Sequence, residues 1–130
     1  MQTTIILDTS FLMACAEFMI DYISEFERIL TTNYAVSAPD IVIQELDTLL
    51  NKGTQKQKQA IKLAKTILAK KNVNIIKTTN AKTADQAILT IASKENIIAT
   101  IDAQLKQKLK KKGISVIVVR QKKYLTIVPA

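Results

Sequence analysis

The sequence predicts an α/β fold, a three-layer α/β/α sandwich around a central, mainly parallel five-stranded sheet. Two observations lead to this fold class. Short apolar runs rich in β-branched residues alternate with amphipathic stretches, and the segments between them are short. This alternation is typical of parallel strands covered by helices on both faces. The 130 residues correspond to one domain, residues 1–130, with a sizeable core.

The first strand is expected at Ile5–Leu7, three aliphatic residues followed by Asp8, Thr9 and Ser10. Four more strands follow along the chain, at 34–37, 73–76, 97–101 and 114–119. Residues 124–128 repeat the pattern, and we expect them to form a further strand at an edge of the sheet.

Helical periodicity predicts helices at 11–22, 23–30, 39–51, 83–94 and 102–112, and another that starts at Thr54 and carries apolar residues as far as Leu68. Pro39 suits a first helical turn, Thr54 is a helix N-cap, and Gly53 is a candidate left-handed C-cap. Thr83 and Gln86 match a capping box, and Gly113 ends the last helix. The helix after Thr54 is expected to bury Ile61, Leu63, Ala64, Ile67 and Leu68.

The residue types present exclude several kinds of active site. The chain has no histidine, which excludes Ser-His-Asp and Cys-His catalysis and His-ligated zinc. With only Gly53 and Gly113, it has neither a GxGxxG motif nor a P-loop. The lone Cys15 favours a reducing compartment, the cytoplasm. We expect no signal peptide and no membrane span, because no stretch approaches about 20 apolar residues.

The net charge of +8 is unevenly distributed. Residues 1–51 carry eight acids and one base, Arg28, for a net charge of −7, whereas residues 52–130 carry 18 Lys or Arg and three acids, for +15. A basic half of this size indicates a polyanionic partner, most simply a nucleic acid. Well-solvated lysine-rich helices would explain the same charge, so composition alone leaves both interpretations open.

Two acids directly follow apolar strands. Asp8 comes after Ile5–Leu7 and Asp102 after 97–101, and each precedes a helical stretch. In open α/β sheets, ligands bind beyond the carboxyl ends of the strands, where both side chains would lie. Either residue taken alone could simply cap the helix that follows it.

Two more acids lie on helix faces that we expect to point inward. Asp85 is followed by apolar residues at the third, fourth and seventh positions, although it could also be an ordinary first-turn acid. A carboxylate on an apolar face is unfavourable unless it is paired or bound to a cation. Glu45 lies within the buried stripe expected for its helix, formed by Ile41, Val42, Leu46 and Leu49.

If the sheet reverses its strand order between the first and fourth strands, all four carboxylates converge at one crevice. Oxygen ligands without His or Cys suit a hard cation, Mg²⁺ or Mn²⁺, rather than zinc. Such clusters activate water and stabilise charge on phosphate oxygens in phosphodiester cleavage. We therefore expect Asp8 and Asp102 to hold the metal, and Glu45 and Asp85 to bind it or to orient the attacking water.

In the order and spacing of four short motifs, the chain resembles the PIN-domain nucleases, single-domain α/β enzymes that cleave RNA. The motifs span nearly the whole chain: LDTS with Asp8, IQEL with Glu45, TADQAIL with Asp85, and ATIDAQL with Thr100 and Asp102. The resemblance implies a PIN-like fold in which the four acids bind one or two divalent metals.

The same resemblance implies that the hydroxyls of Ser10 and Thr100 support the site. Many family members carry another acid shortly after the last one, where this chain has Ala103 and Gln104, so the number of metals stays open. The ending LKQKLKKKGISVIVVR looks most like the branch related to ribosomal RNA processing and to archaeal VapC-like proteins. Toxin ribonucleases share this core, so either role is compatible with the sequence.

We therefore expect a divalent-metal-dependent endoribonuclease that cleaves RNA phosphodiester bonds. Few aromatic residues are available for base stacking, so RNA shape would decide substrate choice. The RNA backbone would be contacted by the lysines of the last helix, which are Lys106, Lys108, Lys110, Lys111 and Lys112.

Two other functions stay open. A catalytically inactive RNA-binding assembly factor of the same fold would keep the basic surface without turnover. A phospho-receiver domain ranks last, because such domains place an Asp after the third strand, where this chain has Lys77, Thr78 and Thr79. A homodimer, an antitoxin and a ribosome-assembly partner are all compatible with the sequence.

Overall fold

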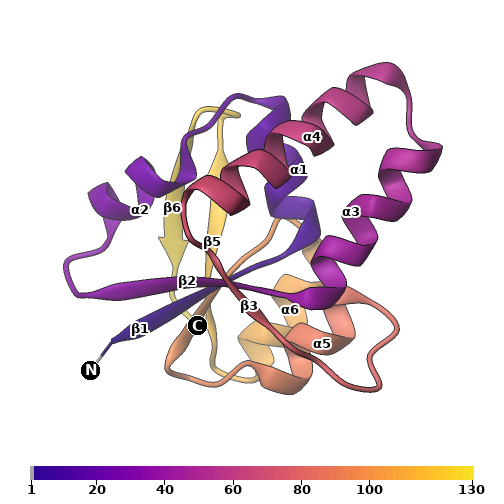
Figure 1. Ribbon diagram of the computed structural model, residues 1–130. Coiled ribbons are helices and arrows are strands. Elements are labelled where there is room, and N and C mark those ends of the chain that lie inside the picture. The colour runs from indigo at the N-terminus through magenta and orange to yellow at the C-terminus, as the bar shows by residue number, and fades with distance from the viewer. Residues whose placement is uncertain (1) are drawn as a thin grey trace.

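A six-stranded sheet forms the middle layer of the computed structural model, which describes residues 2–130 (Figure 1). The strands are β1 (Thr3–Leu7), β2 (Tyr34–Pro39), β3 (Asn74–Ile76), β4 (Asn96–Ala99), β5 (Ser115–Arg120) and β6 (Tyr124–Val128). Their order is β3-β2-β1-β4-β5-β6, with the first five parallel and β6 antiparallel to β5 at one edge. The predicted fold class is confirmed, with the additional strand at the edge where it was expected.

Six helices cover the two faces of the sheet: α1 (Thr9–Glu17), α2 (Tyr22–Ile29), α3 (Asp40–Lys52), α4 (Gln55–Lys70), α5 (Ala84–Ile91) and α6 (Ala103–Lys111). Alternate residues of β1 point to opposite faces. Ile5 and Leu7 pack with residues of α1 to α4, whereas Ile6 packs with residues of α5 and α6. Within residues 2–130, no helix is long and apolar enough to cross a membrane.

The strand order places a topological switch point beside β1. From β1 the chain first adds β2 and β3 on one side, then crosses to add β4 and β5 on the other. Neighbouring crossovers that leave in opposite directions open a crevice at the carboxyl ends of β1 and β4. The reversal expected between the first and fourth strands is therefore present.

Several helix ends differ from the sequence-based expectation. The first helix ends at Glu17 rather than Tyr22, since Met19 takes a positive φ of 56° and turns the chain before Asp21 caps α2. Gly53 has a φ of −81°, so the predicted left-handed cap is wrong there. Glycine fits that position because a Cβ would lie 2.9 Å from Oε1 of Gln57.

The two capping signals also have different outcomes. At Thr54 the capping box is complete, because Gln57 accepts a hydrogen bond from the Thr54 N–H. At Thr83 only half of it forms: Thr83 Oγ1 accepts from the Gln86 N–H, but Gln86 Oε1 accepts from the N–H of Lys82. Gly113, with a φ of +74°, ends the last helix as predicted.

Two leucines expected in the core are exposed. Leu49 on α3 and Leu63 on α4 retain 39% and 41% of their accessible surface. Figure 1 shows the end of α3 and the start of α4 extending past the sheet, which accounts for the exposure of Leu49 near the end of α3. Leu63 lies in the middle of α4, between the buried Ile61 and Ala64. Helical periodicity identifies an apolar face but not whether the fold covers it.

Candidate active site

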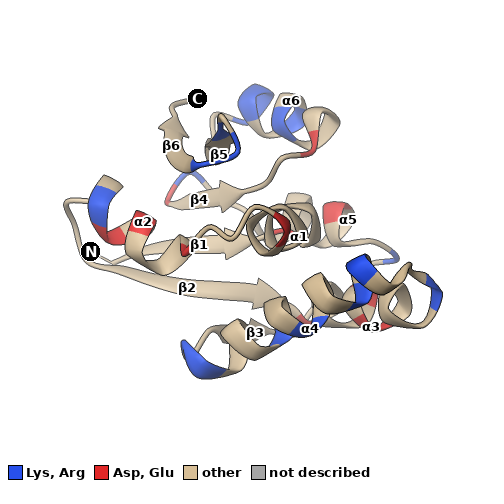
Figure 2. Cartoon of the chain, turned by 90° about the horizontal axis from the view of Figure 1, so that it is seen from above, with Lys and Arg blue, Asp and Glu red and all other residues tan. Residues whose placement is uncertain are grey.

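The carboxyl ends of β1 and β4 bring together the starts of α1 and α6. Asp8 and Thr9 follow β1, and Thr100 and Asp102 follow β4, with β1 and β4 paired directly in the sheet. Figure 2 shows acidic segments at the starts of α5 and α6, with the lysine-rich remainder of α6 beyond. Helix N-termini carry partial positive charge, which favours carboxylates and other anions at this edge.

Asp8 is buried at this edge, with 2% of its surface exposed. Its Oδ2 atom accepts hydrogen bonds from Ser10 Oγ and from Thr100 Oγ1, both at 2.7 Å. Asp8 occupies the N-cap position of α1, yet its side chain forms no capping hydrogen bond within the described chain. Helix capping therefore does not explain the presence of a carboxylate at this position.

Ser10 and Thr100 also hold the turn that leads into α6. Ser10 Oγ accepts from the N–H of Ile101 at 3.2 Å, and Thr100 Oγ1 accepts from the N–H of Asp102 at 3.1 Å. These two hydroxyls therefore join Asp8 to the segment that carries Asp102. The arrangement agrees with the supporting role that the family resemblance implies for Ser10 and Thr100.

Asp102 differs from Asp8 in one respect. Its Oδ1 atom accepts a hydrogen bond from the N–H of Leu105 at 2.9 Å, so one of its oxygens does cap α6. A carboxylate oxygen carries more than one lone pair, and Oδ2 is not used in this cap. Capping and a second role are therefore compatible for Asp102.

Glu45, half-buried on α3, links two helix starts. Its Oε1 atom accepts from Thr9 Oγ1 at 2.6 Å, and its Oε2 atom accepts from the N–H of Ala84 at 2.9 Å. Ala84 is the first residue of α5, where a backbone N–H has no partner within the helix. Thr9 is thus a site residue that the sequence-based analysis missed, although it lies inside the LDTS motif.

Asp85 is half-buried in the first turn of α5, and the pKa of its carboxyl group is strongly shifted. Its pKa is raised to about 6, chiefly by burial and also by the nearby carboxylates of Asp8, Asp102 and Glu45, against an opposing effect of Lys108. The pKa of Asp8 is also raised, chiefly by burial and in part by Glu45, although hydrogen bonds from Thr100 and Ser10 oppose the shift. Asp85 is therefore close enough to the other three acids to be repelled by them, and Asp8 is close enough to Glu45.

Residues 5–122 match the family described as the PIN-like domain. The chain belongs to this family. Ribonuclease VapC4 of Methanocaldococcus jannaschii is 38% identical over 126 residues, which is 95% of each chain. The resemblance to PIN-domain nucleases is thereby confirmed.

Two solved structures are similar to this PIN-like domain. The PIN domain endonuclease Utp24 superposes with a TM-score of 0.80 at 24% identity, covering 98% of this chain and 92% of its own. A domain of a functionally unknown protein from Methanocaldococcus jannaschii superposes with a TM-score of 0.62 at 16% identity, covering 91% of each chain. At these identities the structures support the fold alone.

The donor atoms of the PIN-like domain suit a hard divalent cation, because all four candidate ligands are carboxylates. Among the described residues, however, no three acidic side chains lie close enough to hold one ion together. Glu45 uses both oxygens, and Asp102 one, in hydrogen bonds to the protein. The metal-ligand assignment therefore stays a prediction.

The five lysines predicted to bind RNA do not share one face of α6. Lys108 is near enough to Asp85 to lower its pKa, and Lys112 Nζ donates a hydrogen bond to the carbonyl of Leu89 on α5. Lys106 and Lys110 line a groove on the other side of the helix. An RNA backbone that follows one path along α6 would therefore meet only some of these lysines.

The link through Glu45 gives a testable effect on stability. We expect Glu45→Ala to lower the free energy of unfolding by about 2 to 3 kcal/mol, because it leaves the Ala84 N–H and the Thr9 hydroxyl without their charged acceptor. Glu45→Gln should lower it by less than about 1 kcal/mol, because the amide can accept from Ala84 and donate to Thr9. Urea unfolding of both variants measures the difference, and equal losses would contradict the role given to Glu45.

Proposed function

We propose that this PIN-like domain is a divalent-metal-dependent endoribonuclease that hydrolyses RNA phosphodiester bonds. The observation that carries the proposal is Asp8, a buried carboxylate at the switch point of the sheet whose side chain does not cap a helix. The relation to a ribonuclease at 38% identity supports RNA as the substrate.

In this proposal Asp8 and Asp102 hold Mg²⁺ or Mn²⁺, with Ser10 and Thr100 fixing the orientation of Asp8. The chemistry that such an ion supplies when bound is stabilisation of charge on phosphate oxygens and activation of water. Asp85 has no hydrogen bond to a described residue that would lower its pKa, so its carboxylate is available to orient the attacking water. Glu45 positions the start of α5, and thereby Asp85.

A second function is supported by a specific observation. Glu45 and Asp102 already bond to the protein, and no three described acids are placed to hold an ion. A catalytically inactive RNA-binding assembly factor would need no more than this. Incubating the purified protein with structured RNAs in Mn²⁺ and in EDTA separates the two functions. The nuclease cleaves only with Mn²⁺, whereas the assembly factor binds RNA in both and cleaves in neither.

The lysines of α6 give a prediction about ionic strength. If they neutralise phosphates, RNA affinity should fall steeply with salt, because each contact releases counterions. Changing Lys108, Lys110 and Lys111 to Gln should make the slope of log affinity against log salt shallower by roughly one unit per lost contact. Fluorescence anisotropy in EDTA, at several salt concentrations, measures the slope without cleavage.

A matched control removes the same charge from another helix. Three lysines of α4, which covers the opposite face of the sheet, are changed to Gln together: Lys58, Lys62 and Lys70. This triple variant should keep the wild-type slope. If the α4 and α6 triple variants both make the slope of log affinity against log salt shallower by the same amount, RNA binding depends on overall charge and not on α6.

A further inference from the structure

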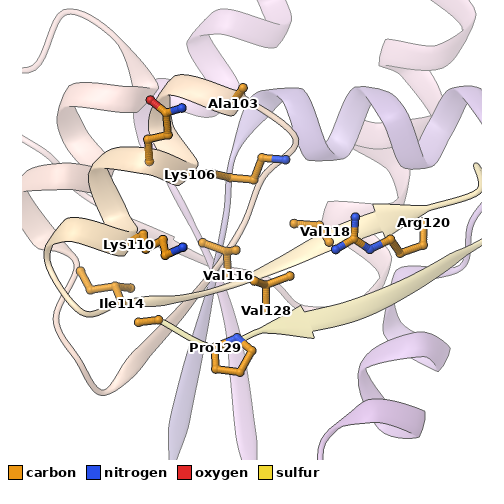
Figure 3. Close-up of a pocket in the computed structure, with 11 residues that line it drawn as sticks. Ala103, Lys106, Lys110, Ile114, Val116, Val118, Arg120, Val128 and Pro129 are labelled. Atoms are coloured by element: carbon orange, nitrogen blue, oxygen red, sulfur yellow. The ribbon is translucent and has the colours of Figure 1, made fainter.

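A groove with an apolar floor and a basic rim runs between α6 and the β5–β6 hairpin (Figure 3). We call it the α6–β5 groove; its volume is about 310 Å³. Val116 and Val118 alternate along β5 and so face the same side of the sheet, beside Val128 of β6. α6 packs onto this face through Leu105 and Leu109 but leaves the groove open next to the hairpin.

Three basic side chains border the α6–β5 groove. Lys106 and Lys110 come from α6, and Arg120 is the last residue of β5. Within residues 2–130, none of the three forms a salt bridge. No acidic side chain of this part of the chain lines the groove, and the one carboxylate among its lining residues is the terminal one of Ala130. Figure 3 shows the Lys106 side chain pointing to the side on which Arg120 lies, with Lys110 beside Ile114 on the other side. Unpaired cations grouped in this way favour an anionic ligand.

The Ala103 end of the groove adjoins the acidic site. β4 and β5 are parallel, and Ala99 of β4 pairs with Ile117 of β5. Asp102 lies three residues after Ala99, and Arg120 lies three residues after Ile117. Arg120 therefore leaves the sheet at the same edge as Asp102. Ala103, which lines the groove, directly follows Asp102.

We propose that the α6–β5 groove binds one unpaired nucleotide of an RNA chain that crosses the acidic site. The base lies against Val118 and Val128, and the phosphate lies between Lys106 and Arg120. This inference rests on the proposed function, because it takes RNA as the substrate. The lysines of α6 would contact only the RNA backbone, whereas the groove adds a contact to a base.

The size and chemistry of the groove favour a nucleotide over an acidic peptide. Its volume is at the low end of the range for small-molecule sites, so it suits one compact ligand rather than a helix. A nucleotide joins a flat aromatic base, whose face can pack on apolar side chains, to a phosphate, and the groove offers an apolar floor beside two unpaired cations. Gln107, on the rim, supplies an amide that can bond to a base edge.

The test observes the groove directly in the intact protein. Valine methyl groups are labelled with ¹³C, and NMR spectra are recorded in EDTA, so that RNA binds without being cut. The probes are a single-stranded pentaribonucleotide, inorganic phosphate and a glutamate-rich peptide. We expect the pentaribonucleotide to shift the methyl signals of Val118 and Val128, and phosphate alone to leave them nearly unchanged, because it brings no base to the floor.

Two variants separate the phosphate contact from the base contact. Arg120→Gln should weaken binding of the pentaribonucleotide roughly fivefold at 0.1 M salt, the counterion-release value for one phosphate of a single strand, and make the salt slope shallower. Val128→Thr, which keeps the side-chain shape at the end of an edge strand, should weaken binding without changing the slope. The matched control is Lys123→Gln on the same hairpin, outside the groove, which should bind as the wild type does.

Either of two results overturns the proposal: Arg120→Gln binding like Lys123→Gln, or Val118 and Val128 signals that shift with the peptide and not with RNA. The groove and the proposed function can fail separately, because the spectra are recorded without metal. Cleavage in Mn²⁺ without RNA-induced shifts at Val118 and Val128 refutes the groove and keeps the nuclease. RNA-induced shifts without cleavage in Mn²⁺ support the groove and refute the nuclease.

Discussion

Asp8→Asn is expected to lower the rate of RNA cleavage by at least about a hundredfold, because even residues that only support metal ligands contribute tenfold to a hundredfold. The amide keeps the shape of the carboxylate, and its carbonyl can accept from Ser10 and Thr100, so the site should stay folded. What it loses is the negative charge that attracts a cation. Cleavage rates at saturating Mn²⁺ measure the effect, and RNA affinity in EDTA should stay within a few-fold of the wild type.

Asp21→Asn is the matched control for this substitution. Asp21 caps α2 by accepting from the N–H of Ser24, it is exposed, and it lies outside the acidic site. Asn caps helices about as well as Asp, so this variant should cleave at the wild-type rate. An Asp8→Asn protein that cleaves as fast as Asp21→Asn would show that Asp8 takes no part in the chemistry.

The contrast between Asp8 and Asp102 shows where local sequence stops being informative. Both acids follow a strand and precede a helix, so the sequence predicts the same two alternatives for each. The structure separates them, because Asp102 caps its helix, whereas Asp8 bonds to Thr100, which is 92 residues away along the chain. Helix caps are local, and the network that fixes Asp8 exists only once β1 and β4 pair.

Hydrophobic periodicity predicted the fold class and the face on which Glu45 lies, since both follow from patterns within one segment. It could not predict the exposure of Leu49, because that depends on how far α3 extends past the sheet. Arg120 was missed for a related reason. Its position at the same end of the sheet as Asp102 follows from the pairing of β4 with β5, and the residues next to Arg120 in sequence give no indication of that position.

Adding Mn²⁺ should stabilise the wild-type protein strongly. A ligand that binds only the folded state contributes RT ln(1 + [L]/Kd), about 2.7 kcal/mol at a hundredfold excess over Kd. For a chain of this length, that corresponds to an increase in Tm of roughly 10 °C. The physical reason is that the charged forms of Asp8 and Asp85 are unfavourable here: burial is the main cause of their raised pKa values, and repulsion from neighbouring carboxylates adds to it. A cation bound among them would relieve this repulsion.

Asp8→Asn should change stability in opposite directions with and without metal. In EDTA it removes one buried charge from a repelling group, so its Tm should equal or exceed that of the wild type, provided that the amide keeps the bonds from Ser10 and Thr100. In Mn²⁺ it should lose most of the added stability, whereas Asp21→Asn should show the full wild-type increase. If Asp8 had only a structural role, Mn²⁺ would raise the Tm of all three proteins equally. Thermal melts of the three proteins in EDTA and in Mn²⁺ therefore decide whether Asp8 belongs to a metal site.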